Sequence, residues 1–201
     1  KVYEDVFERV RARYPDCTII HTEGCIDNLG VDAPSGIEDP AGFKESGWFE
    51  NDGFWWNANA TDWAYSASWP WRAAADHPVY TPVHRYARDI IGGLNSWLVG
   101  WIDWNMVLDT EGGPNHAQNW CIAPVIARPE TGEVYYTPLY YVLAQFSKYI
   151  RPGAVRIGLA GSCESPECLP DELMATAFRN PDGTIVVALL NQSDAAVEYA
   201  L

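Results

Sequence analysis

The stretch Cys17-Thr-Ile-Ile-His-Thr-Glu23 joins a short, β-rich apolar run to a carboxylate at its end. We predict a buried strand over residues 17–22, because β-branched residues are enriched in the run and Pro15-Asp16 ends the helical pattern before it. A second run, Val99-Gly-Trp-Ile-Asp-Trp-Asn105, predicts another buried strand. Apolar strands of this kind are typical of a parallel sheet that is covered on both faces.

Helical patterns alternate with these two strands. Residues 1–13 carry valines at four-residue spacing, which predicts an amphipathic helix. Apolar stripes predict a helix over residues 82–98, although Gly92-Gly93 weakens it, and a third helix from Pro138 to about residue 150. Because helix and strand alternate, the sequence favours an α/β fold with helical crossovers.

Two long segments, residues 27–80 and 106–137, show no sustained period and are interpreted as loops. The first contains six tryptophans, which could form a small core, line sugar subsites, or do both. Both segments follow the carboxyl end of a predicted strand, and in a (β/α)8 barrel the active site lies at that end. Because only two such strands are visible, we predict a truncated (β/α)8 TIM barrel over residues 1–150.

The remainder of the chain changes to a two-residue period. Leu173–Arg179 and Thr184–Leu190 flank the turn sequence Asn180-Pro-Asp-Gly183, which is a strong β-hairpin signal. We therefore predict an all-β segment after residue 150.

The charge and composition exclude several classes of function. With 13 basic and 27 acidic residues, the net charge is −14, which argues against nucleic acid or an anionic membrane surface as a partner. No apolar window reaches the length of a membrane span. The histidines and cysteines show no metal-ligand spacing, so we expect neither a metal nor a cofactor.

The cysteines leave two alternatives open. Cys163 and Cys168 flank a four-residue loop and could form a disulfide or remain free thiols. We expect a secreted or extracytoplasmic protein.

Glu23 and Trp104-Asn105 occupy equivalent positions at the ends of the two predicted strands. A carboxylate beside aromatic rings and amides is typical of sugar binding, because rings pack on the apolar faces of pyranoses while polar groups bind the hydroxyls. Glycosidases use two carboxylates across the scissile bond. Taken alone, Glu23 could instead be a structural acid that caps the next segment.

Several separate motifs support the sugar interpretation, and they follow one another in a fixed order. They are His21-Thr-Glu-Gly-Cys25, Gly100-Trp-Ile-Asp-Trp-Asn105, Leu108-Asp109, Glu111-Gly-Gly-Pro-Asn115, Asn119-Trp-Cys121, Ala123-Pro-Val-Ile126 and Ile150-Arg-Pro-Gly-Ala-Val-Arg-Ile157. Together they resemble glycoside hydrolase family 30, which includes glucosylceramidases and β-1,6-glucanases. The resemblance implies the C-terminal portion of a (β/α)8 barrel over residues 1–150, from about the sixth barrel helix to the eighth. It also implies that residues 151–201 are part of an all-β sandwich domain, and that the mechanism is retaining.

The resemblance also implies roles for four residues. Glu23 would be the nucleophile at the end of the seventh barrel strand, and Trp104, which ends the eighth strand, would line the subsite of the attacked sugar. Asn119 would contact that sugar, and Trp120 would flank it. From the residues alone, Trp104 could be barrel core and Asn119 could tie down its own loop. Asp103 alternates with Trp104, so we predict that it faces away from the subsite and supports the structure.

The family's general acid/base is a Glu in an Asn-Glu-Pro motif, and this triplet does not occur in the sequence. We expect the acid to lie before Lys1, so that this chain alone is inactive and needs the remaining N-terminal part of the same barrel. The expected substrate is a β-linked glucoside or glucan. The long segment 27–80 resembles the bacterial β-1,6-glucanase branch, which leaves glucosylceramide and β-1,6-glucan as alternatives.

Two rival functions compete with a retaining β-glycosidase. A non-catalytic carbohydrate-binding module would account for the tryptophans and the β-rich tail, but not for a Glu at a strand end. An inactive barrel scaffold would keep the fold and lose the chemistry.

Overall fold

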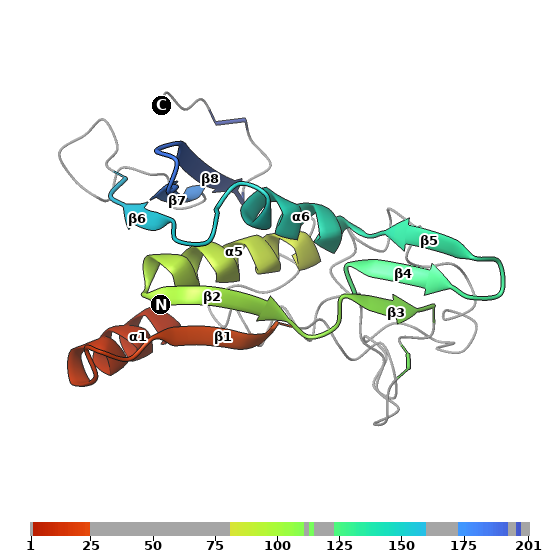
Figure 1. Ribbon diagram of the computed structural model, residues 1–201, viewed down its shortest axis with the longest axis horizontal. Coiled ribbons are helices and arrows are strands. Elements are labelled where there is room, and N and C mark those ends of the chain that lie inside the picture. The colour runs from red at the N-terminus through yellow and green to blue at the C-terminus, as the bar shows by residue number, and fades with distance from the viewer. Residues whose placement is uncertain are drawn as a thin grey trace. The chain divides into compact units, whose positions relative to one another are not determined.

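The computed structural model describes residues 2–24, 81–110, 113–114, 123–159, 173–192 and 196–197. The predicted Trp-rich segment 27–80 lies outside the described residues. The described elements, shown in Figure 1, are α1 (Val2–Arg13), β1 (Ile19–Gly24), α5 (Thr81–Asn95), β2 (Leu98–Asp103), β3 (Val107–Asp109), β4 (Val125–Arg128), β5 (Glu133–Tyr136), α6 (Pro138–Ser147), β6 (Val155–Ile157), β7 (Leu173–Arg179) and β8 (Ile185–Asn191).

The chain divides into two compact units. The first contains Lys1–Thr22, Ala87–Ile102 and Leu143–Leu201, and the second contains Glu23–Tyr86 and Asp103–Val142. None of the described helices is long and apolar enough to cross a membrane.

β1 and β2 are hydrogen-bonded neighbours, and Figure 1 draws their arrows in the same direction, as predicted for a parallel pair. The prediction that both strands are buried was wrong for the described chain, because Ile20, Val99 and Ile102 are 48%, 62% and 51% exposed. Side chains of the two strands lie next to each other at two places. The rings of His21 and Trp101 stack with centroids 5.2 Å apart and planes 7° from parallel. A Cβ added at Gly100 would lie 3.6 Å from the Ile20 side chain, which is an ordinary van der Waals contact.

Trp97 joins the strand pair to α1. It lies between α5 and β2 in a left-handed conformation with φ 74°, which is uncommon for a residue other than glycine. Its Nε1–H donates to Glu8 Oε1 at 2.9 Å, and the Arg11 guanidinium lies 5.0 Å from its ring centre. These two contacts attach Trp97 to α1.

The packing of α5 accounts for one of the two glycines that weakened the predicted helix. An added Cβ at Gly93 would overlap the Leu98 side chain, which would have to move to make room for it. At Gly92 the same atom would lie 3.9 Å from Met174 of β7. Asn95 Nδ2 donates to the carbonyl of Ala175 at 2.9 Å, so the end of α5 is also tied to β7.

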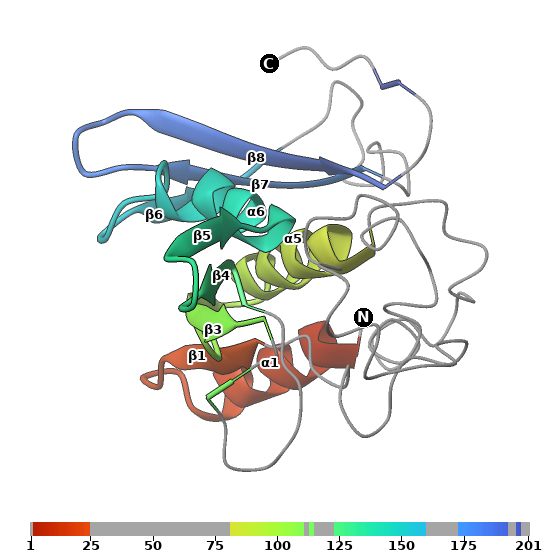
Figure 2. The same cartoon turned by 90° about the vertical axis from the view of Figure 1, so that its right-hand side faces the viewer.

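The predicted hairpin is confirmed. β6, β7 and β8 form an antiparallel sheet in that order, with Leu173 opposite Asn191 and Arg179 opposite Ile185. Figure 2 shows β7 and β8 as a long two-stranded ribbon. The buried Asn180 begins the turn: its Nδ2 donates to the carbonyl of Tyr149 at 2.9 Å, and its Oδ1 accepts from the Arg151 N–H at 3.0 Å.

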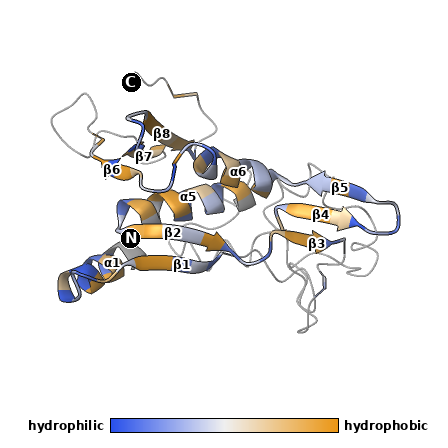
Figure 3. Cartoon of the chain, viewed as in Figure 1, coloured by the Kyte–Doolittle hydropathy of each residue, from blue (hydrophilic) through white to orange (hydrophobic). Residues whose placement is uncertain are grey.

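The second unit contains a three-stranded sheet that the sequence did not predict. The interpretation of residues 106–137 as a loop was wrong for the described part, because β3 pairs in parallel with β4, and β4 pairs antiparallel with β5. These strands are only three or four residues long, too short to show a period. Figure 3 shows β3 and β4 as mostly hydrophobic, and Leu108 and Ile126 are buried.

The buried Thr137 ends this sheet and precedes α6. Its Oγ1 lies 3.0 Å from the carbonyl oxygens of Ala123 and Pro124, and its N–H donates to the Pro124 carbonyl at 2.9 Å. α6 then begins at Pro138, the position predicted from the tolerance of proline in a first helical turn.

Candidate active site

Glu23 is the fifth residue of β1 and its side chain is exposed. The strand extends to Gly24, beyond the predicted end at residue 22, so Glu23 lies within the strand instead of just after it. Gly24, the last strand residue, is buried. A backbone held in a strand fixes the origin of the carboxylate, while exposure leaves its oxygens accessible, and a nucleophile needs both.

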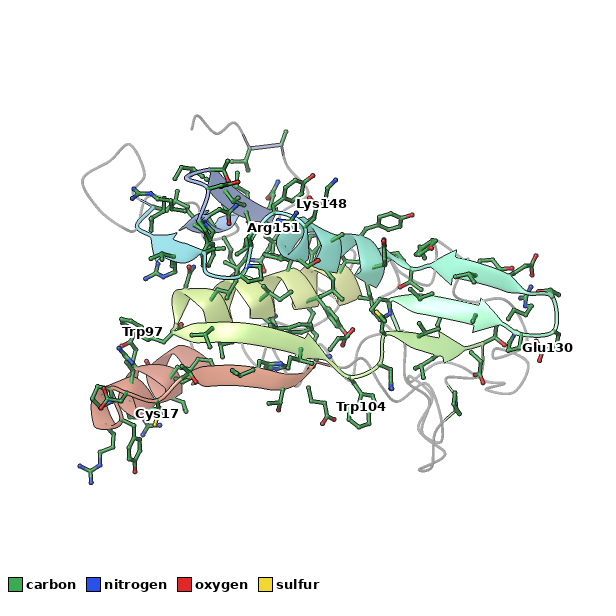
Figure 4. The ribbon with its side chains drawn as sticks, viewed as in Figure 1. Cys17, Trp97, Trp104, Glu130, Lys148 and Arg151 are labelled. Carbon is green, nitrogen blue, oxygen red and sulfur yellow. The ribbon has the colours of Figure 1, made fainter. Side chains whose placement is uncertain are left out.

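Trp104 directly follows β2, at the bend labelled in Figure 4. Its N–H donates to the Gly24 carbonyl at 2.7 Å. The residue next to Glu23 is therefore bonded to the residue that follows the neighbouring strand. The Trp104 side chain is 50% exposed, so part of its ring surface is available to a ligand.

Asp103 supports this bend from the last position of β2. Its Oδ1 accepts from the Tyr86 hydroxyl at 2.8 Å and lies 3.0 Å from the Trp104 nitrogen, whose N–H it also accepts. The prediction that Asp103 supports the structure agrees with these bonds. Burial raises the Asp103 pKa from 3.8 to about 6, and the two hydrogen bonds oppose that rise.

A second half-buried titratable group, His84, lies on α5, close to Tyr86 in sequence. Burial lowers the pKa of His84 from 6.5 to about 4, so the imidazole is neutral at pH 7. Within the described ranges, no three His, Cys, Asp or Glu side chains lie close enough together to hold a metal ion.

Of the four predicted site residues, the structure describes two, Glu23 and Trp104, and the bond from the Trp104 N–H to the Gly24 carbonyl joins the strand ends that carry them. Asn119 and Trp120 lie outside the described residues, as do Cys163 and Cys168. Tyr86 was missed as a neighbour of the site. It belongs to the apolar stripe of α5, and nothing in that stripe marks its hydroxyl as the partner of a residue seventeen positions later.

Comparison with known proteins decides the family. Residues 60–150 match the Glycosyl hydrolase family 30 TIM-barrel domain, and residues 153–201 match the Glycosyl hydrolase family 30 beta sandwich domain. The chain belongs to glycoside hydrolase family 30. This result confirms the predicted fold class, a portion of a (β/α)8 barrel followed by part of a β-sandwich.

Two curated relatives show the breadth of this family 30 similarity. Lysosomal acid glucosylceramidase of Mus musculus is 38% identical over 117 residues, which are 58% of this chain and 22% of that protein. The endo-1,6-β-D-glucanase neg1 of Aspergillus fumigatus is 28% identical over 109 residues, 54% of this chain and 22% of that protein. The chain thus spans about a fifth of the length of the curated relatives it matches.

A solved structure shows the same fold. The crystal structure of SrfJ from Salmonella typhimurium superposes with a TM-score of 0.61 at 24% identity, over 94% of this chain and 31% of that one. At this level of identity the likeness concerns the fold alone.

Proposed function

We propose that the complete protein is a retaining β-glycosidase and that Glu23 is its nucleophile. The observation that carries this proposal is the position of Glu23. It is exposed at the carboxyl end of β1, one residue before the backbone bond to Trp104, in a chain of glycoside hydrolase family 30. Active sites of (β/α)8 barrels lie at this end of the strands.

In the proposed reaction, Glu23 attacks the anomeric carbon and forms a glycosyl-enzyme intermediate, which water then hydrolyses. A second carboxyl group protonates the leaving oxygen and later deprotonates the water. We propose that this group is a Glu in an Asn-Glu-Pro motif in another part of the protein, because the triplet is absent from these 201 residues. The 201 residues alone would then be inactive.

We propose a β-linked glucoside as substrate, with glucosylceramide-like compounds preferred over β-1,6-glucan. Support comes from the higher identity to the mouse glucosylceramidase, 38% against 28% for the fungal glucanase, over segments of similar length. Trp104, Asn119 and Trp120 are the proposed contacts of the attacked sugar.

The test uses the complete enzyme and a 2-fluoro β-glucoside with a good leaving group, which slows hydrolysis of the intermediate. We expect one sugar per enzyme, on the peptide that contains His21-Thr22-Glu23. NMR of a normal turnover should show a product with retained configuration. A label on a different carboxylate, or an inverted product, would remove Glu23 from the role.

The same experiment separates the rival functions. A carbohydrate-binding module or an inactive scaffold would bind a glucoside, for instance in calorimetry, and would acquire no covalent label. Competition between glucosylceramide in detergent micelles and β-1,6-linked oligosaccharides for the labelling reaction would then rank the two substrate classes.

A further inference from the structure

Three hydrogen bonds meet at the start of the turn that follows β2. The Trp104 N–H is shared between the Gly24 carbonyl at 2.7 Å and Asp103 Oδ1 at 3.0 Å. The same Oδ1 accepts from the Tyr86 hydroxyl at 2.8 Å. The Asp103 carboxylate thus accepts hydrogen bonds from the side chain of Tyr86, on α5, and from the backbone of Trp104.

The geometry points to Asp103 as a positioning residue: held by Tyr86, it fixes the backbone of Trp104, and with it the orientation of the Trp104 ring, beside the end of the strand that carries Glu23. This inference rests on the proposed function, because it concerns the sugar subsite of the same reaction. It adds a role for two residues, Asp103 and Tyr86, that do not touch substrate.

The chemistry favours a carboxylate in this position. An ionised oxygen can accept from two donors at once, and hydrogen bonds to a charged acceptor are stronger than neutral ones. Burial, which raises the Asp103 pKa to about 6, also keeps water from competing for these donors. Because half of the Trp104 side chain is exposed, packing constrains its ring less than it would a core residue, and the backbone that carries it matters more.

Two substitutions distinguish the effect of the Asp103 acceptor oxygen from the effect of its negative charge. Asp103→Asn keeps an oxygen that can accept from both donors, whereas Asp103→Ala removes it. In the complete enzyme, we expect Asp103→Ala to lower kcat/KM for an aryl β-glucoside about 10-fold and Asp103→Asn to stay within about 3-fold, because misplacement of a binding group weakens transition-state binding. Tyr86→Phe, which removes one donor, should fall between them.

A double-mutant cycle tests whether Asp103 acts through Trp104. If it does, Asp103→Ala in a Trp104→Ala background should change kcat/KM by less than about 2-fold, since the ring to be oriented is gone. A merely structural role would produce the same loss in both backgrounds. The matched control is Asp182→Ala, which removes a carboxylate that accepts from the Thr184 N–H at 2.9 Å in the β7–β8 turn. It should leave kcat/KM unchanged.

The labelling experiment keeps this inference distinct from the proposed function. If the 2-fluoro glucoside does not label Glu23, the proposed function fails, and the subsite role of Asp103 fails with it. If Glu23 is labelled, while Asp103→Ala reacts at the wild-type rate or loses equal activity with and without the Trp104 ring, the positioning role alone is wrong. All rates are measured well below the thermal midpoint of each variant, which circular dichroism records.

Discussion

The N–H of Trp104 lies 2.7 Å from the carbonyl oxygen of Gly24, the residue that follows Glu23. This bond uses main-chain atoms on both sides, so substitutions of the Trp104 side chain leave it intact. The contribution of the ring to substrate binding can therefore be measured without disconnecting the two strand ends.

We expect Trp104→Ala to lower kcat/KM in the complete enzyme. The fall should correspond to a loss of about 1–3 kcal/mol in transition-state binding free energy, the range for burying one apolar side chain. The free energy of unfolding should fall by less than about 1 kcal/mol, because the ring is 50% exposed. Steady-state kinetics and urea unfolding measure the two quantities. Unchanged kcat/KM with a large loss of stability would show that Trp104 is core.

Trp97 provides both a second prediction and the control for Trp104, since its side chain is 47% exposed. Trp97→Ala removes the hydrogen bond to Glu8 and the ring beneath Arg11. We expect the free energy of unfolding to fall by about 1–2 kcal/mol, because these two interactions are lost. Hydrogen exchange should accelerate in Val2–Arg13 while kcat/KM stays constant. Trp97→Phe, which keeps a ring and loses the donor, should lie between Ala and wild type.

The pH dependence of stability should reflect two half-buried groups, Asp103 and His84, whose pKa values are shifted in opposite directions. The folded protein binds the Asp103 proton more tightly than the unfolded chain does, so this group lowers stability as pH rises from 3.8 to about 6. The folded protein binds the His84 proton less tightly, so His84 raises stability as pH rises from about 4 to 6.5. Each shift corresponds to at most about 3 kcal/mol, and the two largely cancel.

Single substitutions should reveal each slope. Asp103→Asn should give a protein whose unfolding free energy rises as pH increases from about 4 to 6.5, the window of His84. His84→Gln should give one whose unfolding free energy falls as pH increases from 3.8 to about 6, the window of Asp103. Chemical denaturation at closely spaced pH values measures both. Parallel profiles for wild type and Asp103→Asn would contradict the raised pKa of Asp103.

Asn180 is expected to be a strong stability determinant although it is polar. Asn180→Ala would leave the Tyr149 carbonyl and the Arg151 N–H without their side-chain partner, and it would also remove a bond to Thr184 Oγ1. We expect the free energy of unfolding to fall by about 2–4 kcal/mol, because a buried polar group that loses its hydrogen-bond partner destabilises the folded state. Asn180→Asp keeps the acceptor for Arg151 but turns a carboxylate oxygen toward the Tyr149 carbonyl, so it should not restore stability in thermal unfolding. If Asn180→Ala lowers the free energy of unfolding by less than about 1 kcal/mol, these hydrogen bonds do not stabilise the fold as proposed.

The sequence predicted the elements whose signal is local. Leu173–Arg179 shows a clear two-residue period beside an Asn-Pro-Asp-Gly turn, and β7 occupies those residues. Val125–Arg128 and Glu133–Tyr136 were missed because such short strands cannot establish a period. Gly132 lies between them with φ 71°, and together with Pro129 it was a turn signal that could have revealed this hairpin.

The site was predicted in part, for a comparable reason. Glu23 and Trp104 are recognisable because each stands at the end of an apolar run within a distinctive motif. The bond between Tyr86 and Asp103 joins a helix to a strand, and it depends on how the two pack. Sequence spacing carries no information on such a contact.

The two asparagines that bind backbone atoms across the first unit bear on its cooperativity. Asn95, at the end of the barrel helix α5, bonds to β7, and Asn180 in the sandwich hairpin bonds to the segment just before and after residue 150. We therefore expect that the boundary between the two family domains, between residues 150 and 153, does not coincide with a boundary of unfolding. The family models describe the barrel and the sandwich as separate domains. In amide hydrogen exchange, however, we expect α5, the α6–β6 connection and the β7–β8 ribbon to open together as one cooperative unit.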